Sequence, residues 1–227
     1  MNFFKYLYYM YYRPKIFFPK KSYSMFGEDL VVKEIFKNKK NGFYVDVGCY
    51  HPIEGNNTHL LFKKGWTGVN IDLNQTSIEL FNIARKNEKN LNIAISNKSQ
   101  KIKFYYRKKI NMLNTINKKF AKNSFKKGFK IGYVQSETLN SILGKSKIKN
   151  KKIDFLNLDI EGNEINALKS LNFRKYNPKL ICVEIHNNDS SNNLKNYIKK
   201  NSIFKFLKKR GYKRIWKNEF SFIFNRK

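Results

Sequence analysis

Two aspartates and a glycine close two short apolar runs in the first third of the chain. Asp46 and Gly48 end the run that starts at Phe43, and Asp72 ends the run that starts at Gly68. Such runs predict buried strands, and an open parallel sheet binds its ligands where the carboxyl ends of its strands meet. An acid at the end of the second strand, roughly twenty residues after the first, is placed to bind a ribose diol. The spacing indicates a site for a ligand that contains adenosine.

The loop after Gly48 distinguishes two classes of adenosine ligand. A dinucleotide needs further glycines so that backbone amides can approach its pyrophosphate, but residues 49–52 are Cys-Tyr-His-Pro. S-adenosylmethionine has no phosphate, and its positive charges suit a carboxylate such as Asp46. Either aspartate alone would be interpreted as a helix cap. Both together, in register with Gly48, favour S-adenosylmethionine over NAD.

These residues belong to a regular alternation of strands and helices. Continuous apolar strands separated by helices predict an α/β domain, Rossmann-like, with a mostly parallel seven-stranded sheet that has helices on both faces. The domain is expected over 22–227, after an arm at 1–21, with an irregular basic insertion at about 107–130 and a C-terminal antiparallel hairpin. The expected helices are 24–38, 58–64 (capped from Asn56 or Asn57), 75–86, 164–171 and 194–209. The expected strands are 43–47, 68–72, 91–95, 153–159 and 180–185, with hairpins around 102–106 and at 212–224.

Several motifs form one combined pattern from about Ser22 to His186. They are SMFGED at 24–29, FYVDVG at 43–48, Asn57-Thr58, KGW at 64–66, GVNID at 68–72 and IDFLNLDIEG at 153–162. Together they resemble the FkbM family of methyltransferases, whereas the arm and the insertion lie outside the match. The resemblance implies a class I methyltransferase fold and transfer of a methyl group from S-adenosylmethionine to a hydroxyl of a sugar, polysaccharide or secondary metabolite.

The same resemblance implies which positions hold the cofactor. They are Asp46, Gly48, Cys49, Asp72, Ala94 and Ile95, the last two beside the adenine. The chain departs from the family at two positions. Cys49 stands where family members often have a small residue, and His59 follows Asn57-Thr58 where they often have an aromatic one.

Acidic residues and one histidine end the fourth and fifth predicted strands. Because the carboxyl ends of parallel strands open into one cleft, Asp159, Glu184 and His186 are expected beside the cofactor. A hydroxyl acceptor must lose a proton to a base or to a metal-bound partner. In one hypothesis His186 or Glu184 is the base and Asp159 orients the acceptor. In the other, Asp159, Glu184 and His186 bind Mg²⁺, an arrangement resembling that of catechol-type O-methyltransferases. Glu161 and Glu164 could instead merely cap the next helix, an interpretation that we accept for Glu164.

The formal charge of +31, from 47 Lys and Arg against 16 Asp and Glu, raises the question of nucleic-acid binding. Lysines are spread through every segment, and Lys, Asn, Ile, Phe and Tyr are abundant together, which favours a compositional bias of an A/T-rich genome. Alternatives remain an RNA methyltransferase and a non-catalytic basic module for nucleic acid or anionic membrane. Asp159-Ile160-Glu161-Gly162 is not the motif of an N-methyltransferase, and it lacks the lysine of a ribose methyltransferase. Nucleic acid is therefore not favoured as a partner.

The first 18 residues are aromatic and basic. Lys5, Arg13 and Pro14 interrupt them, so they do not form the run of about 20 apolar residues that spans a membrane. A signal-peptide cleavage site is not recognisable. The segment is expected either to pack on the domain, which we favour, or to lie on an anionic membrane. With Cys49 and Cys182 expected as reduced, buried thiols, the predicted location is the cytoplasm, with peripheral contact at the inner membrane face as the alternative.

Overall fold

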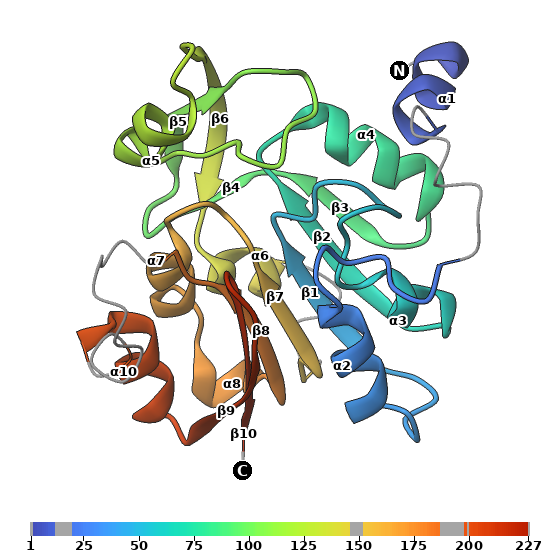
Figure 1. Cartoon of the computed structure of the whole chain (residues 1–227), viewed down its shortest axis with the longest axis vertical. Coiled ribbons are helices and arrows are strands. Elements are labelled where there is room, and N and C mark those ends of the chain that lie inside the picture. Colours follow the sequence, from blue (N-terminus) through green and yellow to red (C-terminus); the bar gives the residue numbers. More distant parts are fainter. Residues whose placement is uncertain (1, 12–19, 146–151, 187–197, 199, 227) are drawn as a thin grey trace.

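A seven-stranded sheet forms the centre of the computed structural model, which describes residues 2–11, 20–145, 152–186, 198 and 200–226 (Figure 1). The strand order is β3-β2-β1-β7-β8-β10-β9. The first five are parallel, and β10 is antiparallel to both β8 and β9. The predicted Rossmann-like fold with its C-terminal hairpin is confirmed. The bounds are β1 Phe43–Val47, β2 Thr67–Asp72, β3 Lys89–Asn92, β7 Phe155–Leu158, β8 Leu180–Glu184, β9 Tyr212–Lys217 and β10 Ser221–Arg226.

Helices cover both faces of this sheet because alternate side chains of each strand point to opposite faces. On one face, Val45 and Val47 of β1 share a core with α6 (Leu139–Lys145), α7 (Glu164–Lys169), α8 (Phe173–Tyr176) and α10 (Ser202–Lys208). On the other, Tyr44 packs with residues of α2 (Glu28–Ile35) and α3 (His59–Lys63), and α4 (Gln75–Ala84) lies beside them. All five residues of β1 are buried, as expected for a central parallel strand.

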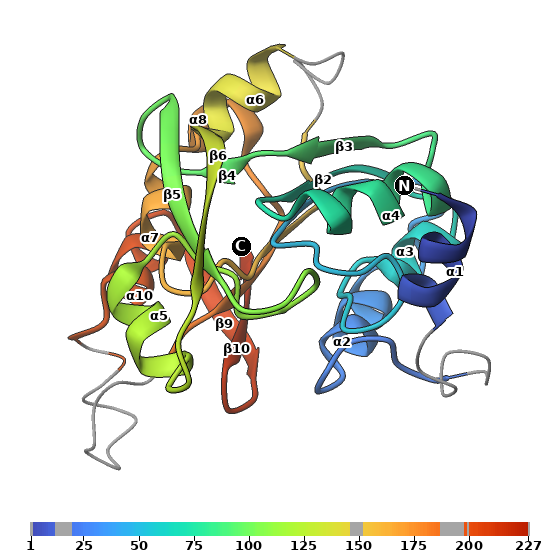
Figure 2. The ribbon, with the colours of Figure 1, turned by 90° about the horizontal axis from the view of Figure 1, so that it is seen from above.

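A second, three-stranded sheet corrects the prediction for the middle of the chain. The expected strand 91–95 is divided between β3 and β4 (Ala94–Ile95), and β4 belongs to this second sheet, whose order is β4-β6-β5. The hairpin expected around 102–106 is instead β5 (Gln100–Tyr106), which pairs with the distant β6 (Lys130–Glu137). The insertion between them contains α5 (Lys118–Ser124) and stands beside the main sheet in Figure 2.

The helices differ from the predicted ones mainly at their ends. Helix α3 begins after Thr58. Asn57 was one of the two expected caps, but its side-chain amide donates to the side-chain oxygen of Asn157 instead. Residues 194–197 and 199 of the expected helix 194–209 lie outside the described residues. Helix α10 begins at Ser202 because the Asn201 side chain accepts from the next backbone amides.

The described part of the N-terminal arm forms α1 (Phe3–Tyr11), which contacts α4. Met10 is buried, and the carbonyl of Tyr9 lies 3.2 Å from Nε2 of His51. Within the described residues, none of the helices combines the length and the apolar character needed to cross a bilayer.

Candidate active site

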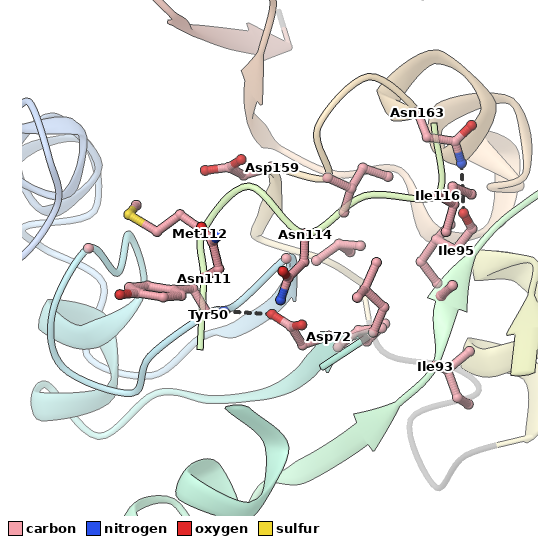
Figure 3. Close-up of a pocket in the computed structure, with 17 residues that line it drawn as sticks. Tyr50, Asp72, Ile93, Ile95, Asn111, Met112, Asn114, Ile116, Asp159 and Asn163 are labelled. Atoms are coloured by element: carbon pink, nitrogen blue, oxygen red, sulfur yellow. Dashed lines mark hydrogen bonds between the residues drawn. The ribbon is translucent and has the colours of Figure 1, made fainter. Parts of the chain in front are cut away.

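A cavity of about 590 Å³ opens where β1, β2 and β7 end, as expected for this class of sheet (Figure 3). Four of the six predicted cofactor positions line it: Gly48, Asp72, Ala94 and Ile95. Asp159 lines it from the end of β7.

Gly48 allows two strand ends to approach each other. Its φ of +80° is in the left-handed region, and a Cβ at this position would lie 1.7 Å from the carbonyl oxygen of Asp159. Its amide donates to the carbonyl of Ile71 over 2.8 Å. Any larger residue would therefore push β1 and β7 apart at the floor of the cavity.

Asp72 presents a carboxylate to the cavity in a fixed orientation. One oxygen accepts from the amide of Tyr50 at 2.9 Å and the other from the amide of Asn74 at 2.7 Å. Burial raises the pKa of Asp72 to about 6, although these two amides oppose the shift. Tyr50 has a left-handed backbone with φ +54°, a conformation that is often found at functional sites.

An apolar wall faces Asp72 across the cavity. It consists of Ile93, Ala94 and Ile95, between the two sheets. The side-chain amide of Asn163 donates to the carbonyl of Ile95 over 2.7 Å, which holds the wall against the start of α7. A flat, largely apolar base suits this wall, and a ribose suits the carboxylate opposite.

Asp46 lies behind the cavity floor. It alternates with Val45 and Val47, so its side chain points to the face that carries α2, α3 and α4. The fully buried carboxylate accepts from Asn157 at 2.9 Å, from Thr58 at 2.8 Å and from Asn56 at 3.3 Å. These bonds fix the loop that follows Gly48 and make Asp46 a support for the cavity.

Two other polar residues of the same loop are also buried. Cys49 packs against Ile78 and Phe81 of α4, and burial raises the pKa of its thiol well above the usual value. The Nδ1 atom of His51 accepts from the amide of Glu54 at 3.0 Å. Both residues therefore stabilise the loop conformation.

The ends of β7 and β8 bring together a cluster of acids around one histidine. Nε2 of His186 lies 2.9 Å from Oε2 of Glu161 and 3.0 Å from Oε2 of Glu184. Asp159 lies close enough to this group that, after burial, the charges of Glu184 and Glu161 raise its pKa. The structure thus places the three residues expected from the sequence side by side and adds Glu161, for which the sequence had offered helix capping only as an alternative. Glu164 does accept from backbone amides before α7, as predicted.

Backbone geometry explains why the sequence did not place Glu161 in this cluster. Its φ of +57° is left-handed, which is uncommon for a residue with a side chain and costs about 1–3 kcal/mol. The signal available in the sequence was the run Asp159-Ile160-Glu161-Gly162, an acid next to a glycine at a strand end.

The cluster retains protons at neutral pH. Burial, then the charges of Glu184 and Glu161, raise the pKa of Asp159 well above its usual range. Burial likewise raises the pKa of Glu161 to about 7. Glu161, whose carboxylate accepts a hydrogen bond from the His186 ring, and then the neighbouring Glu184 raise the pKa of His186 to about 10. His186 is therefore a cation between two carboxyl groups.

The set of groups that could hold a metal ion also differs from the expected one. Among the described residues, the ligand atoms of Glu161, Glu184 and His186 lie within 4.8 Å of one another, with Glu161 in place of Asp159. Two oxygens and one nitrogen can ligate a divalent cation. A metal bound there would have to displace the proton that His186 shares with the two carboxylates.

The comparison with protein families decides the identity of this arrangement. The model described as "Methyltransferase FkbM domain" matches residues 46–214. The chain belongs to the FkbM methyltransferase family. The suspected resemblance is thereby confirmed, and the matched span contains the cavity and the acid–histidine cluster. Membership makes S-adenosylmethionine the expected methyl donor, and the carboxylate of Asp72 and the apolar wall opposite it suit an adenosyl group.

Two solved structures are similar to this FkbM methyltransferase. One is a TehB-like SAM-dependent methyltransferase from Corynebacterium glutamicum ATCC 13032, with 10% identity, a TM-score of 0.44 and coverage of 90% of this chain and 89% of that chain. The other is the methyltransferase domain of bacterial CtHen1, with 16% identity, a TM-score of 0.40 and coverage of 88% and 98%. No curated protein sequence matches the chain.

Proposed function

We propose that this FkbM methyltransferase transfers a methyl group from S-adenosylmethionine to a hydroxyl of a sugar or a related polar metabolite. The observation that carries the proposal is the position of Asp159, which lines the cavity and lies beside Glu184 and Glu161 of the acid–histidine cluster. One residue thus lies both in the candidate cofactor cavity and beside groups that can accept a proton.

The cofactor would be held by the residues of the cavity. Asp72 would accept hydrogen bonds from the ribose hydroxyls, and Ala94 and Ile95 would contact the adenine. S-adenosylmethionine supplies an activated methyl group when it is bound. Gly48 would allow the cofactor to lie against the strand ends without a side chain in between.

The acceptor hydroxyl has to lose a proton as the new bond forms. His186 is already protonated at neutral pH, since its pKa is raised to about 10 by Glu161 and Glu184. We therefore assign the base to Glu184, which lies between His186 and Asp159. His186 would hold the carboxylates in place, and the neutral carboxyl of Asp159 would orient the acceptor.

Aromatic rings beside the cluster support a sugar as the acceptor. The ring of Phe120 lies 4.9 Å from that of His186, and Phe220 lies 6.2 Å away on the terminal hairpin. Phe26 packs on Phe220 at 5.8 Å. These partly exposed rings would form an apolar platform for the C–H face of a sugar, and the carboxylates would bind its hydroxyls.

The test is methyl transfer from labelled S-adenosylmethionine to a bacterial glycan extract, with total RNA in a parallel reaction. Label in the glycan fraction is expected, and label only in RNA would contradict the choice of acceptor. Adding EDTA distinguishes the base from Mg²⁺. Unchanged turnover supports the base, whereas a loss that Mg²⁺ restores would support the metal.

Helix α1 favours a second property, contact with an anionic membrane. Phe4 and Tyr8, one helical turn apart, form an aromatic face that is 79% and 64% exposed; Phe3 at the start of the helix is 67% exposed, while Met10 is buried. The first acid in the chain is Glu28, after five basic residues. Such a face binds at headgroup depth. Vesicles with anionic lipid should retain the protein, and replacing Phe3 and Phe4 by Ser should release it; retention unchanged by the two replacements would contradict the contact.

A further inference from the structure

The basic insertion contributes a segment that crosses the mouth of the cofactor cavity. We call residues 107–117 the strap. In Figure 3 it runs in front of the cavity, with Asn111 and Met112 near Tyr50 and Asn114 between Asp72 and Asp159. Asn111, Met112, Asn114 and Ile116 line the cavity.

The strap is attached at both ends to loops that carry the site. The side-chain amide of Asn74, just after Asp72, donates to the carbonyl of Lys109 at 2.5 Å. The hydroxyl of Thr115 donates to the carbonyl of Glu161 at 2.8 Å. The strap is therefore held across the cavity by anchors on either side of it.

Within the strap, Asn114 is the one described residue whose buried side chain has polar atoms without a hydrogen-bond partner. The residue is 6% exposed, and among the described residues neither Nδ2 nor Oδ1 has a hydrogen-bond partner. Buried amides are rarely left unpaired, since each lost bond is costly. In Figure 3 the amide points to the side of the cavity where Asp72 lies. A donor and an acceptor thus face the cavity without a protein partner.

We propose that Asn114 is a binding residue for the nucleoside part of the cofactor, and that its amide hydrogen bonds the ribose hydroxyls opposite Asp72. The inference rests on the proposed function, because it requires an adenosyl ligand in this cavity. A ribose hydroxyl both donates and accepts. It can therefore donate to the carboxylate of Asp72 and accept from Nδ2 of Asn114 at the same time. The strap would add to the cofactor site a contact that lies outside the strand ends.

The test measures binding of S-adenosylhomocysteine by calorimetry and the melting temperature of the free protein. Asn114→Leu has similar volume but cannot hydrogen bond. We expect the affinity to fall about tenfold, the effect of losing a buried hydrogen bond. We expect the melting temperature of the ligand-free variant to rise by about 2–4 °C, because the unpaired amide is gone. Asn123→Leu, at an exposed position of α5, is the matched control and should leave the affinity unchanged.

A second variant and a second ligand complete the design. Asn114→Ala tests the same loss with a smaller side chain, and circular dichroism reports that each variant is folded. Removing the ribose 2′-hydroxyl from the ligand should weaken binding to the wild type more than to Asn114→Leu. The inference is wrong if both Asn114 variants bind S-adenosylhomocysteine with an affinity within twofold of that of the wild type. It is also wrong if removing the 2′-hydroxyl weakens binding by the same factor in the wild type and in Asn114→Leu. A wild-type protein that binds no adenosyl ligand would instead remove the proposed function itself.

Discussion

Nε2 of His186 lies 2.9 Å from Oε2 of Glu161, although the two residues follow different strands. The contact joins the left-handed turn after β7 to the end of β8. It places a cation beside a buried carboxyl group that would otherwise be protonated more strongly. The proton balance of the cluster therefore depends on both residues.

The rate of methyl transfer is expected to rise with pH through about 7. The pKa of Glu161 is raised to about 7 by burial, so its carboxylate forms in this range and helps Glu184 to accept a proton. Measuring kcat/KM between pH 5.5 and 9 should show this rise in the wild type. Glu161→Gln should remove the inflection near 7. A wild-type profile that is flat from pH 6 to 8 would contradict the assignment.

His186 is expected to stabilise the fold more at low pH than at high pH. Its pKa is raised from 6.5 to about 10 in the folded protein, so the native state binds the proton more tightly than the unfolded chain. The contribution is complete below pH 6.5 and is lost as pH rises to about 10. Urea unfolding should show that the wild type has a larger free energy of unfolding than His186→Gln at pH 6.5, and that the difference between the two free energies becomes smaller as the pH rises to about 10. If this difference in free energy becomes larger as the pH rises, the pKa of His186 is lowered by folding and not raised.

Gly48→Ala is expected to disrupt the cavity. The new Cβ would lie 1.7 Å from the carbonyl of Asp159 and would also hold a left-handed backbone. We expect more than about 2 kcal/mol of destabilisation and loss of S-adenosylhomocysteine binding. Gly65→Ala is the control, with φ +89° and open space around the added carbon. It should cost only the backbone strain of about 1–2 kcal/mol. Equal effects of the two variants would show that the close approach at Gly48 is unimportant.

Arg85 is expected to be essential for stability rather than for chemistry. Its guanidinium is buried and donates to Tyr44 at 3.0 Å, Thr58 at 2.9 Å, Asn56 at 2.9 Å and the carbonyl of Pro52 at 2.6 Å. Arg85→Met would remove these four hydrogen bonds and leave the nearby buried acids Glu88 and Asp46 without a counter-charge.

The expected loss on replacing Arg85 is about 3–5 kcal/mol, measured by urea unfolding. Lys86→Met changes the same charge at the exposed neighbouring position and should alter stability by less than about 0.5 kcal/mol. A small effect of Arg85→Met would mean that the polar network around Asp46 does not depend on this cation.

The central sheet was predictable because its strands are short, apolar and bounded by turn residues. Runs such as Phe43–Val47 and Leu180–Glu184 are largely buried on both faces. A strand that is buried in this way has a nearly continuous apolar sequence, which can be recognised without a structure. Strand β6 was missed because only two of its eight residues are buried and its partner β5 is distant in the chain. Pairing between distant segments leaves no local pattern.

The site was predictable where a role depends on position along a strand. Gly48, Asp72 and Asp159 follow from their place at strand ends, and all three line the cavity. The direction of a side chain was harder to predict. Asp46 points to the opposite face of β1, and Glu161 points to His186 only through a left-handed backbone. Asn114 could not be found at all, because its segment has no regular period.

The anchors of the strap have a consequence for how the enzyme would respond to its ligands. One anchor is beside Asp72 and the other is the carbonyl of Glu161. A ligand that orders the strap from the nucleoside side would thereby also restrict the turn that carries a proton-binding carboxyl group. Binding of the cofactor in the cavity and binding of a proton by Glu161 would then be thermodynamically linked. Each event would change the free energy of the other by the same amount.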